Sequence, residues 1–329
     1  MTDQQPAVSQ SVGAGTPDPV LTIVLPAYNE ASNIGPMAAR IKAVLKDCPH
    51  AYEVIWVNDG STDATATELD ALAASDPQTC VLHLSRNFGH MAALTAGLDA
   101  ACGTGAVITL DADGQHPPEL IPTLLAEWEK GADIVQMIRR KTASAGIVKE
   151  ATSRMFYSVM NRLSAVAIPP GAADFRLLDR QVVDTINGLP ERVRFLRGLT
   201  YWVGFNYTEI PYDAPDRLSG TTKYSFRQMV RFALNGIASF SVRPLRMAFL
   251  LGLIVLFLAG IYAIYVLVCV ATGVHLERGW ASLLLVSLCL GGVQLLTLGI
   301  ASEYLARIYD EAKKRPIYIV RKPRGQTRP

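Results

Sequence analysis

The sequence predicts an α/β fold with a mostly parallel sheet, followed by two membrane-spanning helices. Short apolar runs alternate with helical stretches between residues 21 and 138, which is typical of parallel strands covered by helices on both faces. The polar loops follow the strands, so they gather at one edge of the sheet. Residues 245–272 and 280–302 are each long and apolar enough to cross a bilayer.

The composition excludes several classes of protein. The 329-residue chain has a formal net charge of only +2, which argues against a nucleic-acid partner. The five cysteines are scattered without a Cys-x-x-Cys pair, so we expect reduced fillers rather than a disulfide frame or a zinc site. Residues 1–19 are polar and lack the basic start and apolar core of a signal peptide, which predicts a disordered leader.

The first half of the chain predicts five strands with helices between them. We expect strands at residues 21–25, 52–57, 81–84, 107–110 and 134–138, and helices near residues 33–45, 64–74, 90–101 and 119–128, with Ser32 as the cap of the first helix. A dinucleotide-binding glycine fingerprint does not follow the first strand, and a Walker-type lysine loop is absent from the sequence. These absences argue against a dehydrogenase and a P-loop enzyme.

The stretch from Val107 to Pro118 carries the strongest chemical signal. A buried strand ends in Asp111-Ala112-Asp113, and Pro117-Pro118 prevents its extension. Two carboxylates at the carboxyl end of a strand suit Mg²⁺ or Mn²⁺ that also holds a substrate's phosphates. The alternative is a strand that simply ends in an acidic turn.

The second half of the chain predicts fewer helices and strands, and more breaks between them. We expect an amphipathic helix at residues 149–165, a short strand at 174–178, helices at 181–186 and 192–199, a strand at 207–211 and a polar loop at 216–222. Residues 225–241 have a helical period and lead directly to an apolar span. This position predicts a helix that lies on lipid headgroups.

Charges around the two apolar spans predict their orientation. The connection at residues 273–279 is too short for a domain, and basic residues flank the other ends of the spans: Arg243, Arg246, Arg307, Lys313, Lys314 and Arg315. The positive-inside rule therefore places both termini and the α/β domain in the cytosol. Residues 317–320 predict a short exposed strand, which either pairs with a neighbouring subunit or stays unpaired.

Several stretches together resemble the family 2, GT-A-fold glycosyltransferases of the dolichyl- or polyprenyl-phosphate sugar synthase type. The bacterial two-span enzymes that use undecaprenyl phosphate look most similar. The matching stretches lie between Leu21 and Pro316 in the family's order: Pro26–Glu30, Asn58–Asp63, Ser85–Gly89, Asp111–Gln115, Asp174–Arg176 and Arg217–Lys223. Two departures are Asn58 in place of a common Asp, and Gly114-Gln115-His116 where Leu-Gln-Asp is frequent.

Pattern and resemblance together divide the chain into five parts. These are a disordered leader (residues 1–19), a cytosolic GT-A catalytic domain with a Rossmann-like, mostly parallel sheet (20–224), an interfacial amphipathic helix (225–244), two transmembrane helices with a short outer loop (245–302) and a cytosolic basic tail (303–329). The resemblance implies a multi-pass protein of the plasma (inner) membrane. It also leaves room for a homo-oligomer such as a tetramer.

The resemblance implies inverting transfer of a sugar from a nucleotide-sugar donor, with UDP-glucose as the first choice, to undecaprenyl phosphate. Mg²⁺ or Mn²⁺ is the implied cofactor. One alternative is a processive polysaccharide synthase, although its usual Gln-x-x-Arg-Trp stretch and additional spans are missing from the sequence. A second alternative is a non-enzymatic membrane module that binds a nucleotide sugar.

The resemblance also implies roles for individual residues. The nucleotide pocket is implied to contain Pro26, Tyr28, Glu30, Val57, Asp59, Asp111 and Ala112; the metal site Asp111, Asp113 and Gln115; the phosphate-binding positions Arg139, Arg217 and Lys223; and the catalytic positions Asp113 and Asp174, the latter at the acceptor phosphate.

Elementary chemistry supports these roles independently. An aromatic ring such as Tyr28 can stack on a base, and a divalent ion with arginine and lysine can neutralise a departing diphosphate. Each residue also has a structural alternative. Asp59 could cap the next helix, Arg139 could be a solvated surface cation, Arg217 and Lys223 could be loop bystanders, and Asp174 could pair with Arg176 or another arginine.

Overall fold

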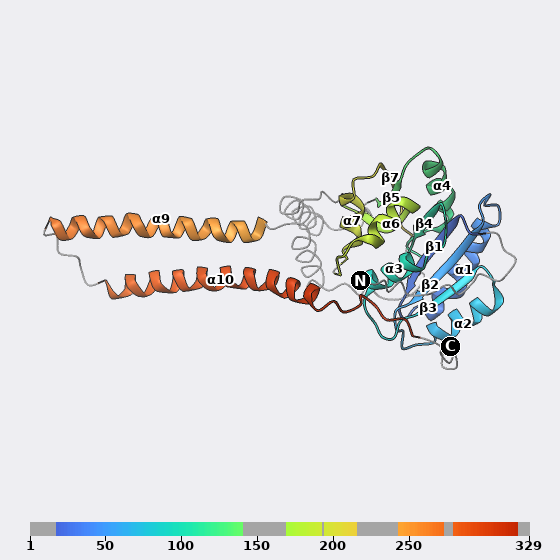
Figure 1. The fold of residues 1–329 in the computed structure, drawn as a ribbon, viewed down its shortest axis with the longest axis horizontal. Helices are drawn as coiled ribbons and strands as arrows, with labels where there is room; N and C mark the ends of the chain where they lie inside the picture. The colour runs from blue at the N-terminus through green and yellow to red at the C-terminus, as the bar shows by residue number, and fades with distance from the viewer. Residues whose placement is uncertain (1–17, 141–168, 193, 216–242, 273–278, 322–329) are drawn as a thin grey trace, which may run out of the picture. The chain divides into compact units, whose positions relative to one another are not determined.

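The computed structural model describes residues 18–140, 169–192, 194–215, 243–272 and 279–321 (Figure 1). Within these ranges the chain forms two compact units. Residues 18–140, 169–192, 194–215 and 316–321 form an α/β unit, and residues 243–272 and 279–315 form a helical pair. The predicted helices at residues 149–165 and 225–241 and the loop at 216–222 lie outside the described residues.

The α/β unit contains a seven-stranded sheet with the strand order β3-β2-β1-β4-β6-β5-β7. The strands are β1 (Leu21–Ala27), β2 (Tyr52–Asn58), β3 (Thr79–His83), β4 (Ala106–Thr109), β5 (Ile134–Arg139), β6 (Ala172–Asp179) and β7 (Tyr207–Tyr212). Strand β6 runs antiparallel to both β4 and β5, and the other neighbouring pairs are parallel. This arrangement confirms the predicted mostly parallel α/β class.

Helices cover both faces of this sheet (Figure 1). They are α1 (Ala31–Leu45), α2 (Thr65–Ser75), α3 (His90–Ala100), the short 3₁₀ helix η1 (Pro118–Leu120), α4 (Ile121–Glu129), α6 (Arg180–Gly188) and α7 (Leu196–Trp202). Alternate residues of β1 point to opposite faces. Ile23 and Leu25 pack in one core cluster with Met37 of α1 and Leu124 of α4, whereas Val24 meets Gly97 of α3 on the other face.

The predicted Ser32 cap is wrong, and the alternative of an Asp59 cap is not what the structure shows. Helix α1 begins at Ala31, so Ser32 lies inside it and is not the cap. The cap position is occupied by Glu30, which forms no side-chain cap hydrogen bond. Asp59 does not cap α2, because that helix begins only at Thr65. The carboxylate that turns toward this helix end is Asp63, whose Oδ1 accepts a hydrogen bond from the Thr65 amide at 3.0 Å.

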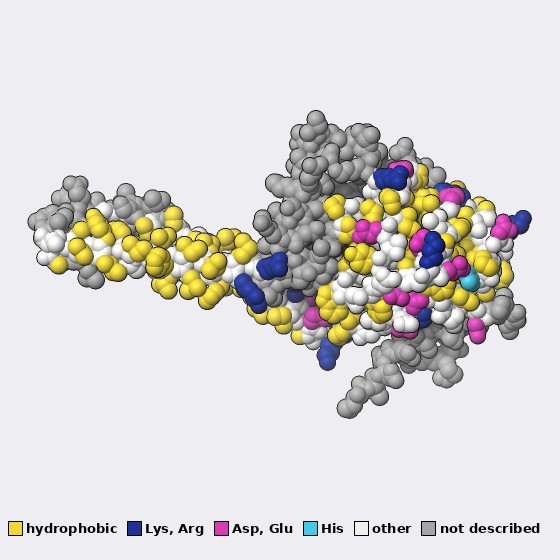
Figure 2. Space-filling view, turned by 90° about the horizontal axis from the view of Figure 1, so that it is seen from above, with side chains coloured by type: hydrophobic (Ala, Val, Ile, Leu, Met, Phe, Trp, Pro, Cys, Tyr) yellow, Lys and Arg dark blue, Asp and Glu magenta, His cyan; other side chains and the backbone are white. Residues whose placement is uncertain are grey.

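The helical pair consists of α9 (Arg243–Ala271) and α10 (Trp280–Ala312), both long and apolar enough to cross a membrane. Large apolar side chains such as Phe249, Leu256 and Leu295 are exposed on these helices, as the hydrophobic surface in Figure 2 shows. Helix α10 continues ten residues beyond the predicted end of its apolar span. Its last turns carry charged side chains, and Arg307 pairs with Glu303 at 3.2 Å. The apolar span that the structure supports in this helix runs from Cys289 to Ala312.

The segment after α10 returns to the sheet and corrects the prediction for residues 317–320. Val320 forms an antiparallel bridge with Leu84, immediately after β3, in the same chain. The Ser85 amide donates to the Ile319 carbonyl at 2.8 Å, and the Arg321 amide donates to the His83 carbonyl at 2.7 Å. The segment is therefore paired within its own α/β unit, because β3 is the edge strand of the sheet and offers unpaired backbone groups.

The contact between α3 and β1 predicts an effect of Gly97→Ala on stability. A methyl group at Gly97 would lie 2.1 Å from Cγ1 of Val24, a short and fully buried side chain. We expect the free energy of unfolding to fall by about 1–3 kcal/mol, the usual effect of overpacking a core. Thermal or denaturant unfolding of the purified protein measures the change.

Gly35→Ala is the matched control, because Gly35 also lies within a helix but has open space where a methyl group would be. This variant should be neutral or more stable by up to about 1 kcal/mol, since alanine favours a helix. Equal stabilities of the two variants would contradict the close packing of α3 on β1.

Candidate active site

The loops that follow β1 and β2 form the first wall of the site. The two strands are parallel neighbours, and Ala27 is in register with Asn58, so both loops leave the same edge of the sheet. Asn29 joins the two loops. Its side-chain Oδ1 accepts a hydrogen bond from the backbone amide of Thr62 at 2.8 Å, and its backbone amide donates to Ser61 Oγ at 3.0 Å. The positive φ of 54° at Asn29 is one that asparagine tolerates better than most residues.

The residues expected in a nucleotide pocket divide by exposure. Pro26 and Val57 are buried in β1 and β2, and Ala112 is buried in the turn after β4, so these side chains line the inner side of the wall. Tyr28 is 38% exposed and Glu30 is partly buried, so these two side chains reach the surface of the loop. An exposed ring next to a carboxylate can stack on a base and accept hydrogen bonds from it.

Asp59 is buried and latches the loop after β3. Its Oδ1 accepts a hydrogen bond from the Phe88 amide at 2.7 Å, and its Oδ2 accepts one from the Gly89 amide at 2.9 Å. Burial raises the pKa of Asp59, and these two amides offset part of that effect. Asp59 thus organises the Ser85–Gly89 loop, which sequence reasoning did not foresee because the bonded amides are about thirty residues away.

Asp111 and Asp113 follow β4 and lie on the same edge of the sheet. Asp111 Oδ1 is buried and accepts no hydrogen bond from the described residues. Asp113 Oδ1 accepts from the Gln115 amide at 3.0 Å across a turn in which Gly114 has a φ of 82°. An unsatisfied buried carboxylate oxygen beside a second carboxylate fits a divalent cation.

The described residues contain no cluster of three or more His, Cys, Asp or Glu side chains that could hold a metal alone. A cation at Asp111 and Asp113 would therefore need further oxygen ligands, which a phosphate-bearing ligand could provide. Gln115 is partly buried in the same turn, where it could complete such a set.

His116 stabilises the turn after β4 through its contact with Asp111, and its ring is not directed at a cation site. The ring is buried, stacks on Phe175 with centroids 5.4 Å apart, and accepts a hydrogen bond from the Asp111 amide at its Nδ1, 2.8 Å away. A nitrogen that accepts from an N–H carries no proton. The 3.5 Å approach of Nδ1 to Asp111 Oδ2 is therefore not an ion pair.

Asp174 on β6 is the anchor of a buried cationic cluster. Its Oδ1 accepts a hydrogen bond from Arg176, and its Oδ2 accepts one from Arg197 of α7 at 2.7 Å. His90 Nε2, from the first residue of α3, lies 3.3 Å from the same Oδ2. We define Asp174, Arg176, Arg197 and His90 as the Asp174 cluster.

The electrostatics of the cluster favour full ionisation. Burial alone would raise the pKa of Asp174, but the charge of Arg197, the hydrogen bond with His90 and the charge of Arg176 hold that pKa well below its usual range. Burial alone would lower the pKa of His90, whereas the carboxylates of Asp111 and Asp174 raise it to about 9. His90 Nε2 is 3.6 Å from Asp111 Oδ1, so it links the cluster to the paired carboxylates.

Tyr212 shows that Arg139 belongs to the same neighbourhood. Burial raises the pKa of Tyr212 to about 12; the charges of Arg139 and Arg197 lower it, and those of Asp111 and Asp113 raise it further. The hydroxyl of Tyr212, at the end of β7, therefore interacts electrostatically with all four of these charged side chains. Its ring packs edge-on against Phe175 with centroids 6.0 Å apart.

His90 joins Asp111 to Asp174, and the charges of Asp111, Asp113 and Arg139 all act on Tyr212, whereas Arg217 and Lys223 lie outside the described residues. His90, Tyr212 and the cationic partners of Asp174 enlarge the predicted set. A signal for His90 was present in the sequence, because it directly follows the loop after a predicted strand. Tyr212 ends a strand that is exposed on alternate residues, so its pattern gave no such signal.

Arg194 does not belong to this site. Its side chain is largely buried, donates to the Asn187 and Leu189 carbonyls, and lies 3.8 Å from Asp99.

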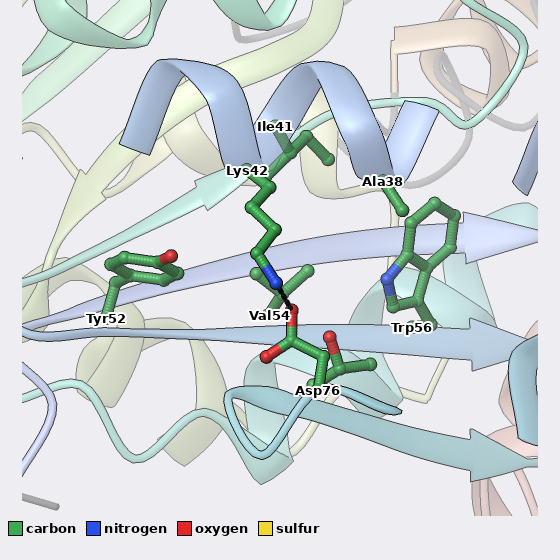
Figure 3. Close-up of a pocket in the computed structure, with 8 residues that line it drawn as sticks. Ala38, Ile41, Lys42, Tyr52, Val54, Trp56 and Asp76 are labelled. Carbon is green, nitrogen blue, oxygen red and sulfur yellow. Dashed lines mark ion pairs between the residues drawn. The ribbon is translucent and has the colours of Figure 1, made fainter. Parts of the chain in front are cut away.

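A small hollow between α1 and β2 is also remote from the carboxylates. It is lined by Lys42, Tyr52, Trp56 and Asp76 among others (Figure 3). Its volume of about 20 Å³ holds roughly one water molecule and no nucleotide.

Comparison with known proteins gives the class of this chain. Residues 22–186 match the sequence model of the family described as Glycosyl transferase family 2. The chain belongs to this family. Its sheet is the Rossmann-like, mostly parallel GT-A kind, and two candidate membrane helices follow it.

Curated relatives align with nearly the whole chain. An uncharacterized glycosyltransferase of Synechocystis sp. is 46% identical over 301 residues, which is 91% of this chain and 94% of the relative. An SfII prophage-derived bactoprenol glucosyl transferase of Shigella flexneri is 39% identical over 302 residues, 92% and 97% of the two chains. Among solved structures, the mannosyltransferase PcManGT from Pyrobaculum calidifontis, in complex with GDP-Man and Mn²⁺, is 19% identical, with 88% of each chain covered and a TM-score of 0.47.

The latch formed by Asp59 predicts the effect of Asp59→Asn. An amide side chain can accept from only one of the two loop amides and turns its NH₂ group toward the other. We expect faster hydrogen exchange at residues 85–90, by roughly five- to tenfold, as the loss of about 1 kcal/mol implies. Exchange in β7 should stay unchanged, and a protected 85–90 loop in this variant would contradict the latch.

Proposed function

We propose that this protein transfers a sugar from a nucleotide-sugar donor to the phosphate of a polyprenyl carrier, with inversion at the anomeric carbon. UDP-glucose is the proposed donor and undecaprenyl phosphate the proposed acceptor. Relatives named bactoprenol glucosyl transferases support both choices, since they align with 92% of this chain. The observation that carries the proposal is the Asp174 cluster beside Asp111, whose Oδ1 lies 3.6 Å from His90 Nε2 of the cluster.

The proposed donor side of the site is the edge formed by the loops after β1, β2 and β4. Tyr28 and Glu30 would contact the base or ribose, while Asp59 acts through the loop that it latches. Asp111, Asp113 and Gln115 would hold Mg²⁺ or Mn²⁺ together with the donor diphosphate. A divalent cation bound there supplies neutralisation of the charge that develops on the leaving nucleotide diphosphate.

The proposed acceptor side is the Asp174 cluster. Arg197 is only partly buried, and its guanidinium is always charged, so it can bind a phosphate oxygen of the carrier. A phosphate monoester has a second pKa near 6 and is largely ionised at neutral pH, so it needs little deprotonation before it attacks.

Asp174 therefore serves in this proposal as the fixed anion that orients the cations, not as a base. A carboxylate with a strongly lowered pKa is a poor proton acceptor. Arg176, which also donates to the Leu196 carbonyl and to Thr200 Oγ1, ties β6 to α7 and so fixes the position from which Arg197 reaches inward.

The helical pair would anchor the enzyme at the bilayer that contains the carrier, and so raise the local concentration of acceptor. The α/β unit and residues 316–321 must lie on the same side of that bilayer, because they pair in one sheet. Basic residues flank the spans on this side, including Arg243 and Arg246 before α9 and Lys313–Arg315 after α10. The proposed location is thus the inner membrane with a cytosolic active site.

The proposal is tested by transfer of radiolabel from UDP-[¹⁴C]glucose to undecaprenyl phosphate, with the product extracted into organic solvent. Asp111→Asn and Asp113→Asn should each lower turnover by about a hundredfold or more, since each removes charge that would bind the cation. Titration with Mn²⁺ should show no saturable activation in these variants. Wild-type activity in either variant would overturn the assigned site, and label that never enters the organic phase would overturn the reaction.

Arg197→Gln tests the acceptor side separately. We expect KM for undecaprenyl phosphate to rise about tenfold, because one charge-assisted hydrogen bond of about 1.5 kcal/mol is lost. The affinity for UDP should stay unchanged, and Arg197→Lys should recover part of the loss. Arg180→Gln is a suitable control, because Arg180 pairs with Asp184 outside the site. An unchanged KM for the acceptor would remove Arg197 from the proposed acceptor site.

A further inference from the structure

The C-terminal segment Pro316–Arg321 forms hydrogen bonds with the rest of the α/β unit at two places. Its backbone pairs with the end of β3 through two hydrogen bonds, Ser85 N–H to the Ile319 carbonyl and Arg321 N–H to the His83 carbonyl. The Tyr318 hydroxyl donates to Asp99 Oδ2 at 2.9 Å, and Asp99 lies on α3. The segment therefore touches the two elements, β3 and α3, that the Ser85–Gly89 loop connects.

That loop leads directly into the proposed donor site. Ser85, its first residue, is held by the segment, and Phe88 and Gly89, its last residues, are held by Asp59. Gly89 has a φ of 99° and precedes His90, the member of the Asp174 cluster that also approaches Asp111. Only two residues of the loop, Arg86 and Asn87, lie between the two attachments.

The loop also packs tightly against the turn that carries Asp59. Gly60 has a φ of 64°, and a methyl group there would lie 2.2 Å from the carbonyl carbon of Arg86. The Arg86 guanidinium covers the Phe88 ring at 4.1 Å. A shift at Ser85 therefore cannot be absorbed within the loop without moving Arg86 against the turn at Gly60, because backbone in van der Waals contact transmits displacement.

We propose that Pro316–Arg321 is a positioning segment of the donor site. By completing the edge of β3 it fixes Ser85, and through the loop it holds the Asp59 latch and the start of α3 in the arrangement that receives the nucleotide. This inference rests on the proposed function for the identity of the ligand, but the mechanical link between segment and loop does not. The segment touches neither ligand nor reacting atoms, so its role is to position other residues.

Two substitutions at one position test the link in the full-length, detergent-solubilised protein. Arg321→Pro removes the amide that donates to His83, and proline favours an extended conformation for Val320, which the bridge already requires. Arg321→Ala removes only an exposed side chain and keeps the amide. The pair thus separates backbone pairing from side-chain chemistry. The measurements are hydrogen exchange by residue and the dissociation constant of UDP with Mn²⁺.

We expect Arg321→Pro to speed exchange at residues 83–90 and to raise the dissociation constant of UDP by roughly two- to tenfold, as the loss of one hydrogen bond implies. Arg321→Ala should match the wild type in both measurements. The effects of Arg321→Pro and Asp59→Asn on exchange of the loop should be less than additive in the double variant, because both release the same loop.

Three results would overturn the inference. They are unchanged exchange of the loop in Arg321→Pro, equal effects of the proline and alanine variants, and faster exchange that extends over β5 and β7, which would make the segment a general stabiliser. A wild-type protein that binds neither UDP nor GDP would instead contradict the proposed function. The exchange measurement would still decide whether the segment positions the loop.

Discussion

The buried carboxylate of Asp174, with a positive group on each of its oxygens, is the interaction on which the candidate site depends. It joins three elements, since Arg176 comes from β6 itself, Arg197 from α7 and His90 from α3. Burying such a carboxylate is costly unless its charge is compensated, and removing one partner of a buried pair leaves an uncompensated charge. The fold therefore holds these helices at the sheet edge through a balance of charge as much as through apolar packing.

Strand β6 is what makes this balance geometrically feasible. It is the antiparallel member of a mostly parallel sheet and lies between β4 and β5. Its direction brings Asp174 near the end of β4, where Asp111 follows, while Thr109 Oγ1 donates to the Asp174 carbonyl at 2.8 Å. The proposed donor and acceptor sides thus meet across one pair of hydrogen-bonded strands.

Local patterns predicted the elements well because burial and period are encoded within a few residues. The β1 to β4 alternation and the polar loops after each strand follow from such patterns, and the paired carboxylates after β4 are visible in the sequence itself. The partners of Asp59 could not be predicted in this way. A cap on the helix that follows was the local alternative for Asp59, yet its oxygens accept hydrogen bonds from the amides of Phe88 and Gly89 in another loop. Long-range pairing of this kind leaves no periodic trace, which is also why the partner of residues 317–320 was not predicted.

The return of the chain to β3 gives the two apolar helices unequal attachments. The α/β unit continues to α9 through the covalent chain, whereas the described residues beyond α10 are fastened to the sheet by a few hydrogen bonds and one tyrosine contact. A break in the connection between α9 and α10 would leave each helix with its own attachment to the same sheet. The second attachment depends on non-covalent bonds alone, so it is the weaker of the two.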